Sequence, residues 1–327
     1  MTLPNGYFGN APTSWQTLDT KLMSKHLADE GYEIICTDIV NLLNYDLSAR
    51  DFVVYTAADN DEVNRYVLDI LYFAKDRGAV LVPPYEIMQS YENKGFQCLY
   101  RKKVGIEDLD ETYLFDLSSF SREYPFVYKD VMGAGSSGVE LVNNKKEWAK
   151  IVNNKMRIGF IQQLKNYIRK LHLTHEQYGF YEYKYKAFKR FVTQEFVSGL
   201  DCDYRVLIFA EKYYPMKRAV RKNDFRASGS KDFSYSDIPL EVLDYALLIK
   251  QKIDSPFLSL DIAFSKKNKK CELIEYQGLS FGTSALRKSK GYYSCNNLTD
   301  GWVFFEKEPN LELSYSEALY EYVKKYE

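Results

Sequence analysis

A glycine-rich loop between two short apolar segments constrains this chain more than any other stretch. Residues 126–142 read FVYKDVMGAGSSGVELV, so one apolar segment carries Lys129 into the loop and a second begins at Val139. Glycines let backbone N–H groups approach an anion closely, because no Cβ intervenes. A Walker-type phosphate loop would end in GK[ST] and lead into a helix, and this loop does neither. The stretch therefore predicts a β-hairpin, which is either a flexible turn or a lid over a polyphosphate.

Composition and charge exclude several classes of protein. The 327 residues suffice for two or three domains, and the apolar fraction of 46% is that of a globular protein. The net charge of −1 gives no reason to expect nucleic acid or an anionic membrane as a partner. The 5 cysteines form no CxxC pair, which argues against a zinc site and a disulfide framework. With no signal-peptide pattern and no apolar run of about 20 residues, we expect a cytoplasmic protein without membrane insertion.

The first part of the chain alternates between helical and strand patterns. Such alternation is typical of a small open α/β domain with a parallel sheet. We expect helices at 14–30 and 61–75, and strands at 32–36, 52–55 and 79–82. There is no GxGxxG fingerprint, so a dinucleotide is not assigned to this part.

The remaining chain mixes helices and strands differently. Residues 85–101 predict one helix with Lys94 near its middle, 145–170 another helix, and 177–189 a solvated segment. Strands are expected at 191–197, 203–210 and 213–220, followed by a helix that starts near Pro239 and a final hairpin at 257–264 and 271–278.

The final hairpin carries carboxylates in a regular pattern. Side chains alternate across a strand with a period of two residues. Pairing Phe264 with Lys270 places on the core face an apolar set made of Leu258, Leu260, Ile262, Phe264, Ile274 and Tyr276. The other face then holds Asp261, Glu275 and Gln277, oxygen donors of the kind that suits Mg²⁺. The alternative is a half-exposed hairpin with ordinary polar residues outside.

Four segments in a consistent order resemble the ATP-grasp superfamily. Within it they are similar to the branch of carboxylate–amine ligases that includes enzymes adding glutamate to a ribosomal protein tail. The segments are KDVMGAGSSGVELV (129–142), like the family's lysine and glycine-rich lid; QEFVSGLDCDYRV (194–206), like its adenine hinge strand with a D-x-R pattern; MKRAVRKNDFRAS (216–228), like that branch's arginine segment; and LDIAF with ELIEYQG, like its metal-binding strands. The resemblance covers roughly residues 80–290.

This resemblance implies an α/β (α+β) chain with the ATP-grasp fold. An N-terminal open parallel α/β domain would occupy residues 1–88, a central region with the lid 89–194, and a C-terminal subdomain with hinge and metal site 195–327. The nucleotide would be held between two α+β subdomains.

Carried over by position, the resemblance implies a role for each matching residue. Lys129 and Lys94 would contact the nucleotide phosphates under a lid made of Gly133, Gly135, Ser136, Ser137 and Gly138. Adenine would be bracketed by Gln194, Glu195, Phe196 and Val197, and the ribose reached by Asp201 or Asp203. Arg226, with Lys217 or Arg218, would steady the acyl-phosphate or the transferred phosphoryl group. Mg²⁺ would be held by Asp261, Glu275 and Gln277.

Two departures from the family pattern fall near the acceptor side. The metal strand reads E-x-Q where the family usually has E-x-N, and Ala227-Ser228 follows the arginine where the related branch has Ser-Asn. We therefore expect ATP and Mg²⁺ as cofactors, but the substrates cannot be transferred by analogy.

The expected activity is an ATP-dependent ligase that joins a carboxylate to an amine or amino acid through an acyl-phosphate. The carboxylate could belong to a small molecule, a peptide or a sugar acid, and a homodimer is possible. The alternatives are a phosphotransferase with the same fold, which gives a phosphorylated product, and a nucleotide-binding protein without turnover.

Overall fold

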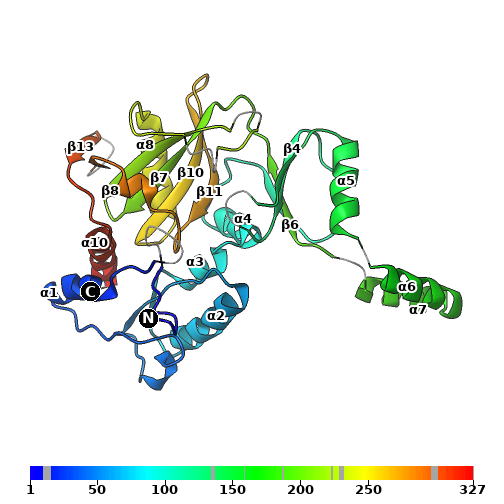
Figure 1. The fold of residues 1–327 in the computed structure, drawn as a ribbon, viewed down its shortest axis with the longest axis horizontal. Coiled ribbons are helices and arrows are strands. Elements are labelled where there is room, and N and C mark those ends of the chain that lie inside the picture. Colours follow the sequence, from blue (N-terminus) through cyan, green and yellow to red (C-terminus); the bar gives the residue numbers. More distant parts are fainter. Residues whose placement is uncertain are drawn as a thin grey trace. The chain divides into compact units, whose positions relative to one another are not determined.

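The computed structural model describes residues 1–9, 16–133, 137–157, 159–185, 188–221, 224–227, 232–295 and 301–326. The chain divides into two compact units: unit 1 holds Met1–Leu109 and Val197–Glu327, and unit 2 holds Asp110–Phe196. Both contain helices and sheets, so the predicted mixed α/β class is confirmed (Figure 1). The division into three regions stays a prediction. Among the described residues, no helix has the length and apolar character needed to cross a membrane.

The N-terminal part of unit 1 contains a two-stranded parallel sheet. β1 (Phe52–Val54) pairs with β2 (Val80–Val82), and α2 (Asp61–Asp76) connects them, as a parallel crossover requires. The Asn60 side chain caps α2 by accepting a hydrogen bond from the Val63 N–H at 3.1 Å. These elements were expected from the sequence, and the buried face of α2 is made of Val67, Leu71 and Ala74.

The predicted strand at 32–36 is wrong. This segment belongs to no helix and no sheet, and the nearest bridge is the isolated parallel pair Thr2 and Asp38. An apolar, β-branched sequence makes a strand only where a second backbone edge pairs with it. Before this segment lies α1 (Thr20–Asp29), which starts later than predicted because the Asp19 carboxylate caps it there. After it comes the short helix η1 (Leu42–Asn44).

The helix predicted over 85–101 is interrupted. α3 (Tyr85–Ser90) ends before Glu92, which has a left-handed φ of +48°, and α4 (Lys94–Lys103) begins after it. The side chain of Asn93 caps α4 by accepting a backbone hydrogen bond at 3.1 Å. Lys94 therefore starts a helix instead of lying in the middle of one.

The main sheet of unit 1 has the strand order β11-β10-β7-β8-β12-β13, with β9 paired to β8. Neighbouring strands are antiparallel. The strands are β7 (Cys202–Phe209), β8 (Lys212–Ala219), β9 (Phe233–Ser234), β10 (Phe257–Ser265), β11 (Lys270–Gln277), β12 (Gly291–Ser294) and β13 (Val303–Glu306). β7, β8 and the β10–β11 hairpin lie where the sequence predicts them.

Each face of this sheet contributes to a separate hydrophobic core. One face packs against α8 (Leu240–Lys252), which begins directly after Pro239 as predicted. The other packs against α9 (Ser284–Arg287) and α10 (Leu311–Val323), and α10 lies beside α1 and continues into η2 (Lys324–Tyr326) (Figure 1). That second face is apolar only in part, and its other end carries the charged residues described below.

The register of the β10–β11 hairpin differs from the predicted one. Phe264 lies opposite Cys271, and Lys270 lies opposite Ser265. The predicted pairing of Phe264 with Lys270 is therefore wrong by one residue. The polar turn between the strands does not fix the register, because it offers no glycine or proline that would select one turn type.

A β-bulge in β11 restores the polar face in spite of this shift. Ile262 lies opposite Leu273, whereas Asp261 lies opposite Glu275, so Ile274 is the extra residue. Leu273 is buried in the core in place of Ile274. Asp261 and Glu275 consequently share one face, as predicted, although by a different register.

Unit 2 is built on an antiparallel sheet with the strand order β3-β6-β4-β5. The strands are β3 (Glu111–Leu114), β4 (Phe126–Asp130), β5 (Val139–Val142) and β6 (Phe191–Glu195). β4 and β5 flank the glycine-rich loop and pair with Phe126 opposite Val142, which confirms the predicted hairpin. α5 (Lys145–Lys155) lies along this sheet, and its Trp148 and Ile151 belong to the same core (Figure 1).

The helix predicted over 145–170 is two helices. α5 ends at Lys155, and α6 (Phe160–His172) starts after Gly159, which lacks a side chain to support a continuous helix. α7 (His175–Tyr185) follows, so the segment expected to be solvated at 177–189 is helical in its first part.

Candidate active site

Strand alternation in unit 2 gathers a lysine, a carboxylate and an amide. Gln194 on β6 lies between Glu111 on β3 and Val127 on β4. Lys129 is two residues after Val127 on β4, so its side chain lies on the same face of the sheet. The Lys129 Nζ is 3.5 Å from the Glu111 carboxylate, and Gln194 donates a hydrogen bond to that same carboxylate. All three side chains are buried. The predicted phosphate lysine is thus a buried charge that a neighbouring carboxylate holds in place.

The base of the glycine-rich loop is fixed by Asp130. The Asp130 carboxylate accepts hydrogen bonds from Lys155 at 2.5 Å and from the Tyr128 hydroxyl at 2.8 Å, and Lys189 lies 3.6 Å away. Burial alone would raise the pKa of Asp130, but these donors and cations bring its pKa below the ordinary value. The carboxylate therefore stays ionised beside the loop.

Gly138 closes the described part of this loop. Its φ is +69°, and its carbonyl accepts a hydrogen bond from the Asp130 N–H at 2.8 Å. A Cβ at this position would come within 2.8 Å of the Asp130 Cβ. Gly133, at the start of the loop, has a φ of +126°, and a Cβ there would meet the Ser137 side chain. The predicted lid residues Gly135 and Ser136 lie outside the described residues.

In unit 1, the charged end of the main sheet is a row of paired ions. Arg218 on β8 donates two hydrogen bonds of 2.7 Å to Asp203 on β7, its cross-strand neighbour. Arg205 on β7 donates to Asp261 on β10, its own neighbour, at 2.8 and 2.9 Å. Arg218 also reaches Asp261 at 2.8 Å. Two carboxylates thus hold two guanidinium groups on one face of the sheet.

Burial makes these charges depend on one another. Burial would raise the pKa of Asp261, but Arg205 and Arg218 hold it well below its usual range. Asp203 is also buried, which raises its pKa, and Arg218 opposes that rise. Burial lowers the pKa of Arg218, but Asp261 and Asp203 outweigh this and raise it above the ordinary value. The side chain of Arg218 is only 3% exposed, so the loss of one member would leave a buried charge without compensation.

The predicted metal ligands lie at the edge of this row. Asp261 lies opposite Glu275, and the Gln277 amide donates to the Glu275 carboxylate at 3.3 Å. No group of three or more His, Cys, Asp and Glu side chains within the described ranges is arranged to hold a metal by itself. Arg205 and Arg218 use three of the roughly four acceptor positions of the Asp261 carboxylate, which leaves one. Two carboxylates and an amide oxygen nevertheless suit Mg²⁺ as donors.

Lys94 lies near Glu92, whose charge is also influenced by Glu275 on β11. It is buried at the start of α4, two residues after the left-handed Glu92. Burial raises the pKa of Glu92; Asp59 and Glu275 raise it further, and Lys94 lowers it. Lys94 and Glu275 are therefore both close enough to Glu92 to act on its charge.

Several predicted site residues fall elsewhere or remain apart. Lys217 lies opposite Tyr204 and so faces the core with α8, whereas Arg218 faces the charged row. Arg226 is held by Asp224, with hydrogen bonds of 2.7 to 3.0 Å. Asp201 is exposed, unlike Asp203.

The predicted adenine hinge, Gln194 to Val197, lies where the chain passes from unit 2 to unit 1. Glu195 is exposed, Phe196 and Val197 are half-buried, and the division falls between the last two. The bracket predicted for adenine therefore consists of the last residues of unit 2 and the first residue after it.

Sequence reasoning missed three residues that organise these clusters. Arg205 was visible as the arginine of the D-x-R pattern but received no role. Glu111 had no signal, because its strand β3 is short and no motif marks it. Glu92 had none either, since a left-handed non-glycine residue is not readable from a single sequence.

Comparison with known proteins identifies the fold. No protein-family model matches the chain, and no curated protein does. Solved structures do match. A RimK domain protein ATP-grasp from Sphaerobacter thermophilus DSM 20745 aligns with a TM-score of 0.53 at 10% identity, over 94% of this chain and 97% of its own.

Two further structures align over similar lengths. D-cycloserine synthetase DcsG gives a TM-score of 0.52 at 10% identity, covering 93% of this chain and 94% of its own. The ATP-grasp ligase PsnB, complexed with a minimal precursor, Mg and ADP, gives 0.50 at 11% identity over 93% and 94%.

Proposed function

We propose that this chain, which has the ATP-grasp fold, is an ATP-dependent ligase that joins a carboxylate to an amine or amino acid through an acyl-phosphate. The observation that carries the proposal is the buried row in which Asp203 and Asp261 hold Arg218 and Arg205 in fixed positions. Guanidinium groups held in fixed positions can donate hydrogen bonds to a phosphoryl group during its transfer. The names of DcsG, a synthetase, and PsnB, a ligase, agree with this chemistry.

The nucleotide-binding roles predicted from the sequence are kept in this proposal. In the proposal, Lys129 and Lys94 contact the phosphates, and the loop ending at Gly138 covers them through its N–H groups. Gln194 to Val197 bracket the adenine. Of the two aspartates considered for the ribose, we assign Asp201, because Asp203 is already engaged by Arg218.

The reaction would take two displacements. A carboxylate oxygen of the first substrate attacks the γ-phosphorus of ATP, the bond to ADP breaks, and an acyl-phosphate forms. The amine nitrogen of the second substrate then attacks the acyl carbon, phosphate leaves with the bonding electrons, and the nitrogen loses a proton. Arg218, rather than Lys217, would face the phosphoryl group, together with Arg226. Closure of the loop would exclude the water that hydrolyses an acyl-phosphate.

The metal would belong to the Asp261, Glu275 and Gln277 set. Bound Mg²⁺ would offset the negative charge of the phosphates. Neighbouring residues would orient the two carboxylates: Arg205 donates a hydrogen bond to Asp261, and the Gln277 amide donates one to Glu275. The predicted cytoplasmic location, the carboxylate and amine partners and a homodimer stay predictions.

A product-resolved assay tests this proposal. Purified protein is given ATP and Mg²⁺ with pools of carboxylates and amines, and ADP and free phosphate are measured together. A ligase releases both only when both substrates are present. With an ¹⁸O-labelled carboxylate, one label must appear in the phosphate, because that oxygen is transferred with the phosphoryl group.

The alternatives give other outcomes in the same assay. A phosphotransferase releases ADP with one substrate and yields a phosphorylated product in place of free phosphate. A nucleotide-binding protein without turnover binds ATP and releases no ADP in any pool. Either result, or phosphate free of ¹⁸O, contradicts the acyl-phosphate ligase.

A further inference from the structure

In unit 2, α6 carries a continuous apolar face that is open to solvent. Its apolar residues recur at a spacing of three and four, so at about 100° per residue they fall within about a third of the helix circumference. Each is between 47% and 79% exposed, and none of the 13 residues of α6 is buried. The residues of this α6 face are Phe160, Ile161, Leu164, Tyr167, Ile168 and Leu171. Contiguous exposed apolar surfaces mark sites of interaction.

The polar side of α6, and not the α6 face, packs against α7 (Figure 1). Gln162 donates a hydrogen bond to the Tyr181 hydroxyl at 3.2 Å, and that hydroxyl donates one to Asn166 at 3.2 Å. The guanidinium carbon of Arg169 lies 4.4 Å from the centre of the Tyr181 ring. In a helix pair that is complete by itself, the apolar faces of the two helices meet. The observed arrangement instead leaves the α6 face free for a partner.

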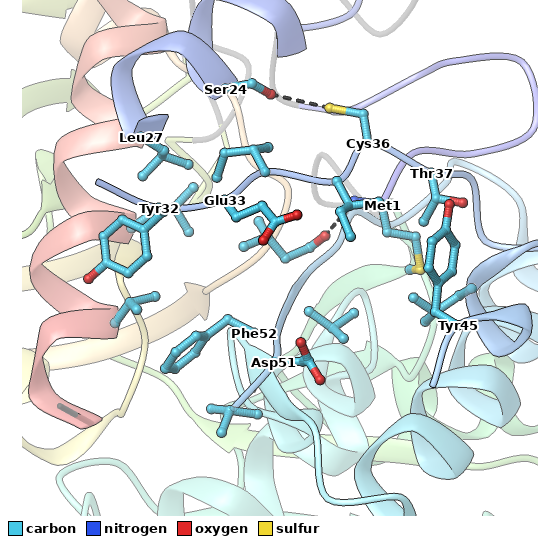
Figure 2. Close-up of a pocket in the computed structure, with 18 of the residues that line it drawn as sticks. Met1, Ser24, Leu27, Tyr32, Glu33, Cys36, Thr37, Tyr45, Asp51 and Phe52 are labelled. Carbon is cyan, nitrogen blue, oxygen red and sulfur yellow. Dashed lines mark hydrogen bonds between the residues drawn. The ribbon is translucent and has the colours of Figure 1, made fainter. Parts of the chain in front are cut away.

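The α6 face has the shape of a surface and not of a ligand pocket. Small molecules bind in concave sites, whereas this face lies on the convex outside of one helix. The cavity of about 820 Å³ that Figure 2 shows is formed by unit 1 residues such as Leu27, Tyr32 and Phe52, and no residue of α6 lines it. The occupant of the α6 face is therefore itself an extended surface.

Positive charge surrounds the α6 face. The chain has a net charge of −1, but residues 148–175 contain no aspartate or glutamate. The lysines and arginines of this stretch are Lys150, Lys155, Arg157, Lys165, Arg169 and Lys170. At about 100° per residue, Lys165 lies beside one border of the apolar arc and Lys170 beside the other, and both are exposed. Such side chains lay their apolar stems along an apolar surface and keep the ammonium group in a polar layer. The occupant should accordingly be apolar inside and anionic at its border.

Two other occupants suit this arrangement less well. If a second copy of the chain packed its α6 face against this one, the flanking lysines of the two copies would come together, and like charges repel. A protein groove that encloses a helix needs most of the helix circumference, but α7 already occupies the polar side of α6. A lipid bilayer needs one face only.

We propose that α6 binds the surface of an anionic lipid bilayer, with its axis in the plane of the membrane. The α6 face enters the boundary between headgroups and acyl chains, and Lys165 and Lys170 lie among the lipid phosphates. The helix lies on the bilayer and does not cross it, because 13 residues extend about 20 Å and the hydrocarbon core is about 30 Å thick. This attachment is independent of the ligase proposed above, since no residue of α6 belongs to the charged row or to the glycine-rich loop.

Sedimentation of the full chain with lipid vesicles tests the attachment. One set of vesicles is phosphatidylcholine alone, and the other contains about one third phosphatidylserine. We expect binding to the anionic vesicles to be tighter by about tenfold or more, and to weaken when salt is added. Equal binding to both sets, or binding to neither, overturns the proposal. No ATP is present, so the outcome does not depend on the proposed ligase reaction.

Paired leucine replacements locate the apolar contact. Leu164→Ser with Leu171→Ser removes two side chains of the α6 face that are 51% and 67% exposed. The control is Leu99→Ser with Leu248→Ser, on α4 and α8, where the side chains are 50% and 46% exposed. The α6 pair should weaken vesicle binding by about tenfold or more, and the control pair should leave it unchanged. Equal effects of the two pairs contradict binding through the α6 face.

Paired lysine replacements test the charge while keeping good helix formers in place. Lys165→Gln with Lys170→Gln should weaken binding to the anionic vesicles by about tenfold, since each lysine near the surface contributes to the attraction. Lys21→Gln with Lys25→Gln, at exposed positions of α1, should not weaken it. Circular dichroism checks that each variant keeps its helices. Binding that survives the α6 lysine pair overturns the proposal.

Sedimentation velocity without lipid tests the second copy as the occupant. We expect the replacements of Leu164 and Leu171 to leave the sedimentation coefficient unchanged. A dimer that these two replacements dissociate would assign the α6 face to a second copy and overturn the proposal.

Discussion

Asp261 and Arg205 face each other across the β7–β10 ladder and are joined by two hydrogen bonds of 2.8 and 2.9 Å. Arg218 reaches the same carboxylate and binds Asp203 as well, so one buried guanidinium links two carboxylates. Such a row is weak evidence of stability as a whole, because desolvation opposes the attraction. It becomes costly when one member is removed, because the remaining charges stay buried without compensation.

Replacing Arg218 should destabilise the fold strongly. Arg218→Met leaves Asp203 and Asp261 buried with less compensation, and the free energy of unfolding should fall by about 3–5 kcal/mol, as for other broken buried pairs. Denaturant unfolding measures it. Arg65→Met is the matched control, because Arg65 forms an exposed i,i+4 pair with Asp61 and its removal should cost about 0–1 kcal/mol. Equal losses in the two variants would show that the row is no more coupled than a surface pair.

Gly138 should tolerate a side chain far less well than another glycine of the same backbone conformation. Gly138→Ala forces a Cβ against Asp130, whereas Gly199→Ala, with a φ of +74°, meets nothing within 4 Å. Both pay for the left-handed conformation, about 1 kcal/mol. Gly138→Ala should lose clearly more stability in thermal unfolding and raise KM for ATP, since the loop must shift. Equal effects at the two positions would show that the close contact with Asp130 is not maintained in solution.

Period-two alternation predicted the polar face of the main sheet correctly, because Asp261 and Glu275 follow it along their strands. The register was not predictable, since Ile274 is looped out and no residue type marks a bulge of this kind. The predicted polar and apolar faces are nevertheless correct for Asp261 and Glu275, because the bulge compensates for the one-residue shift in register. The face on which a side chain lies was therefore easier to predict than its partner across the strands.

Other features depended on contacts far away in sequence. Glu111 becomes the partner of Lys129 only because β3 adds to the edge of β6, and four residues of strand give too short a pattern to read. The apolar run at 32–36 was read as a strand from its composition, yet composition does not supply the neighbouring edge that pairing needs. The sequence pattern of 85–101 is that of one continuous helix, but the left-handed φ of Glu92 separates α3 from α4.

Asp130 should give the fold a defined acid sensitivity. Its folded pKa lies below the ordinary value, so the ionised carboxylate contributes its full stabilisation above about pH 4 and loses it as the pH falls through the folded pKa. Asp130→Asn should cost about 1–3 kcal/mol at pH 7, the range of hydrogen bonds to charged groups. The difference between wild type and variant, from unfolding between pH 3 and 8, should shrink only below about pH 4. A difference that is constant down to pH 3 would contradict this assignment.

Lys129 should act on ATP as well as on the fold, because its removal leaves the buried Glu111 carboxylate with less compensation. Lys129→Met removes the proposed phosphate contact, and turnover should fall at least a hundredfold with a raised KM for ATP. Lys129→Arg retains the charge near Glu111 and should recover part of the activity. Lys102→Met, at an exposed position of α4, should change neither constant. Steady-state kinetics with circular dichroism on each variant decides the matter, and full activity in a folded Lys129→Met protein would exclude the phosphate role.

The Mg²⁺ requirement should follow the length of the side chain at position 277. Gln277 donates to Glu275 at 3.3 Å, and its extra methylene places the amide further along than the asparagine of the family pattern E-x-N would. Gln277→Asn should therefore lower the Mg²⁺ concentration for half-maximal activity severalfold. Glu275→Gln removes a charged oxygen donor and should raise that concentration at least tenfold. Glu241→Gln, on α8 and paired with Lys269, is the control and should leave the titration unchanged. If Mg²⁺ titrations of Glu275→Gln and Glu241→Gln coincide, the metal is not held by this strand.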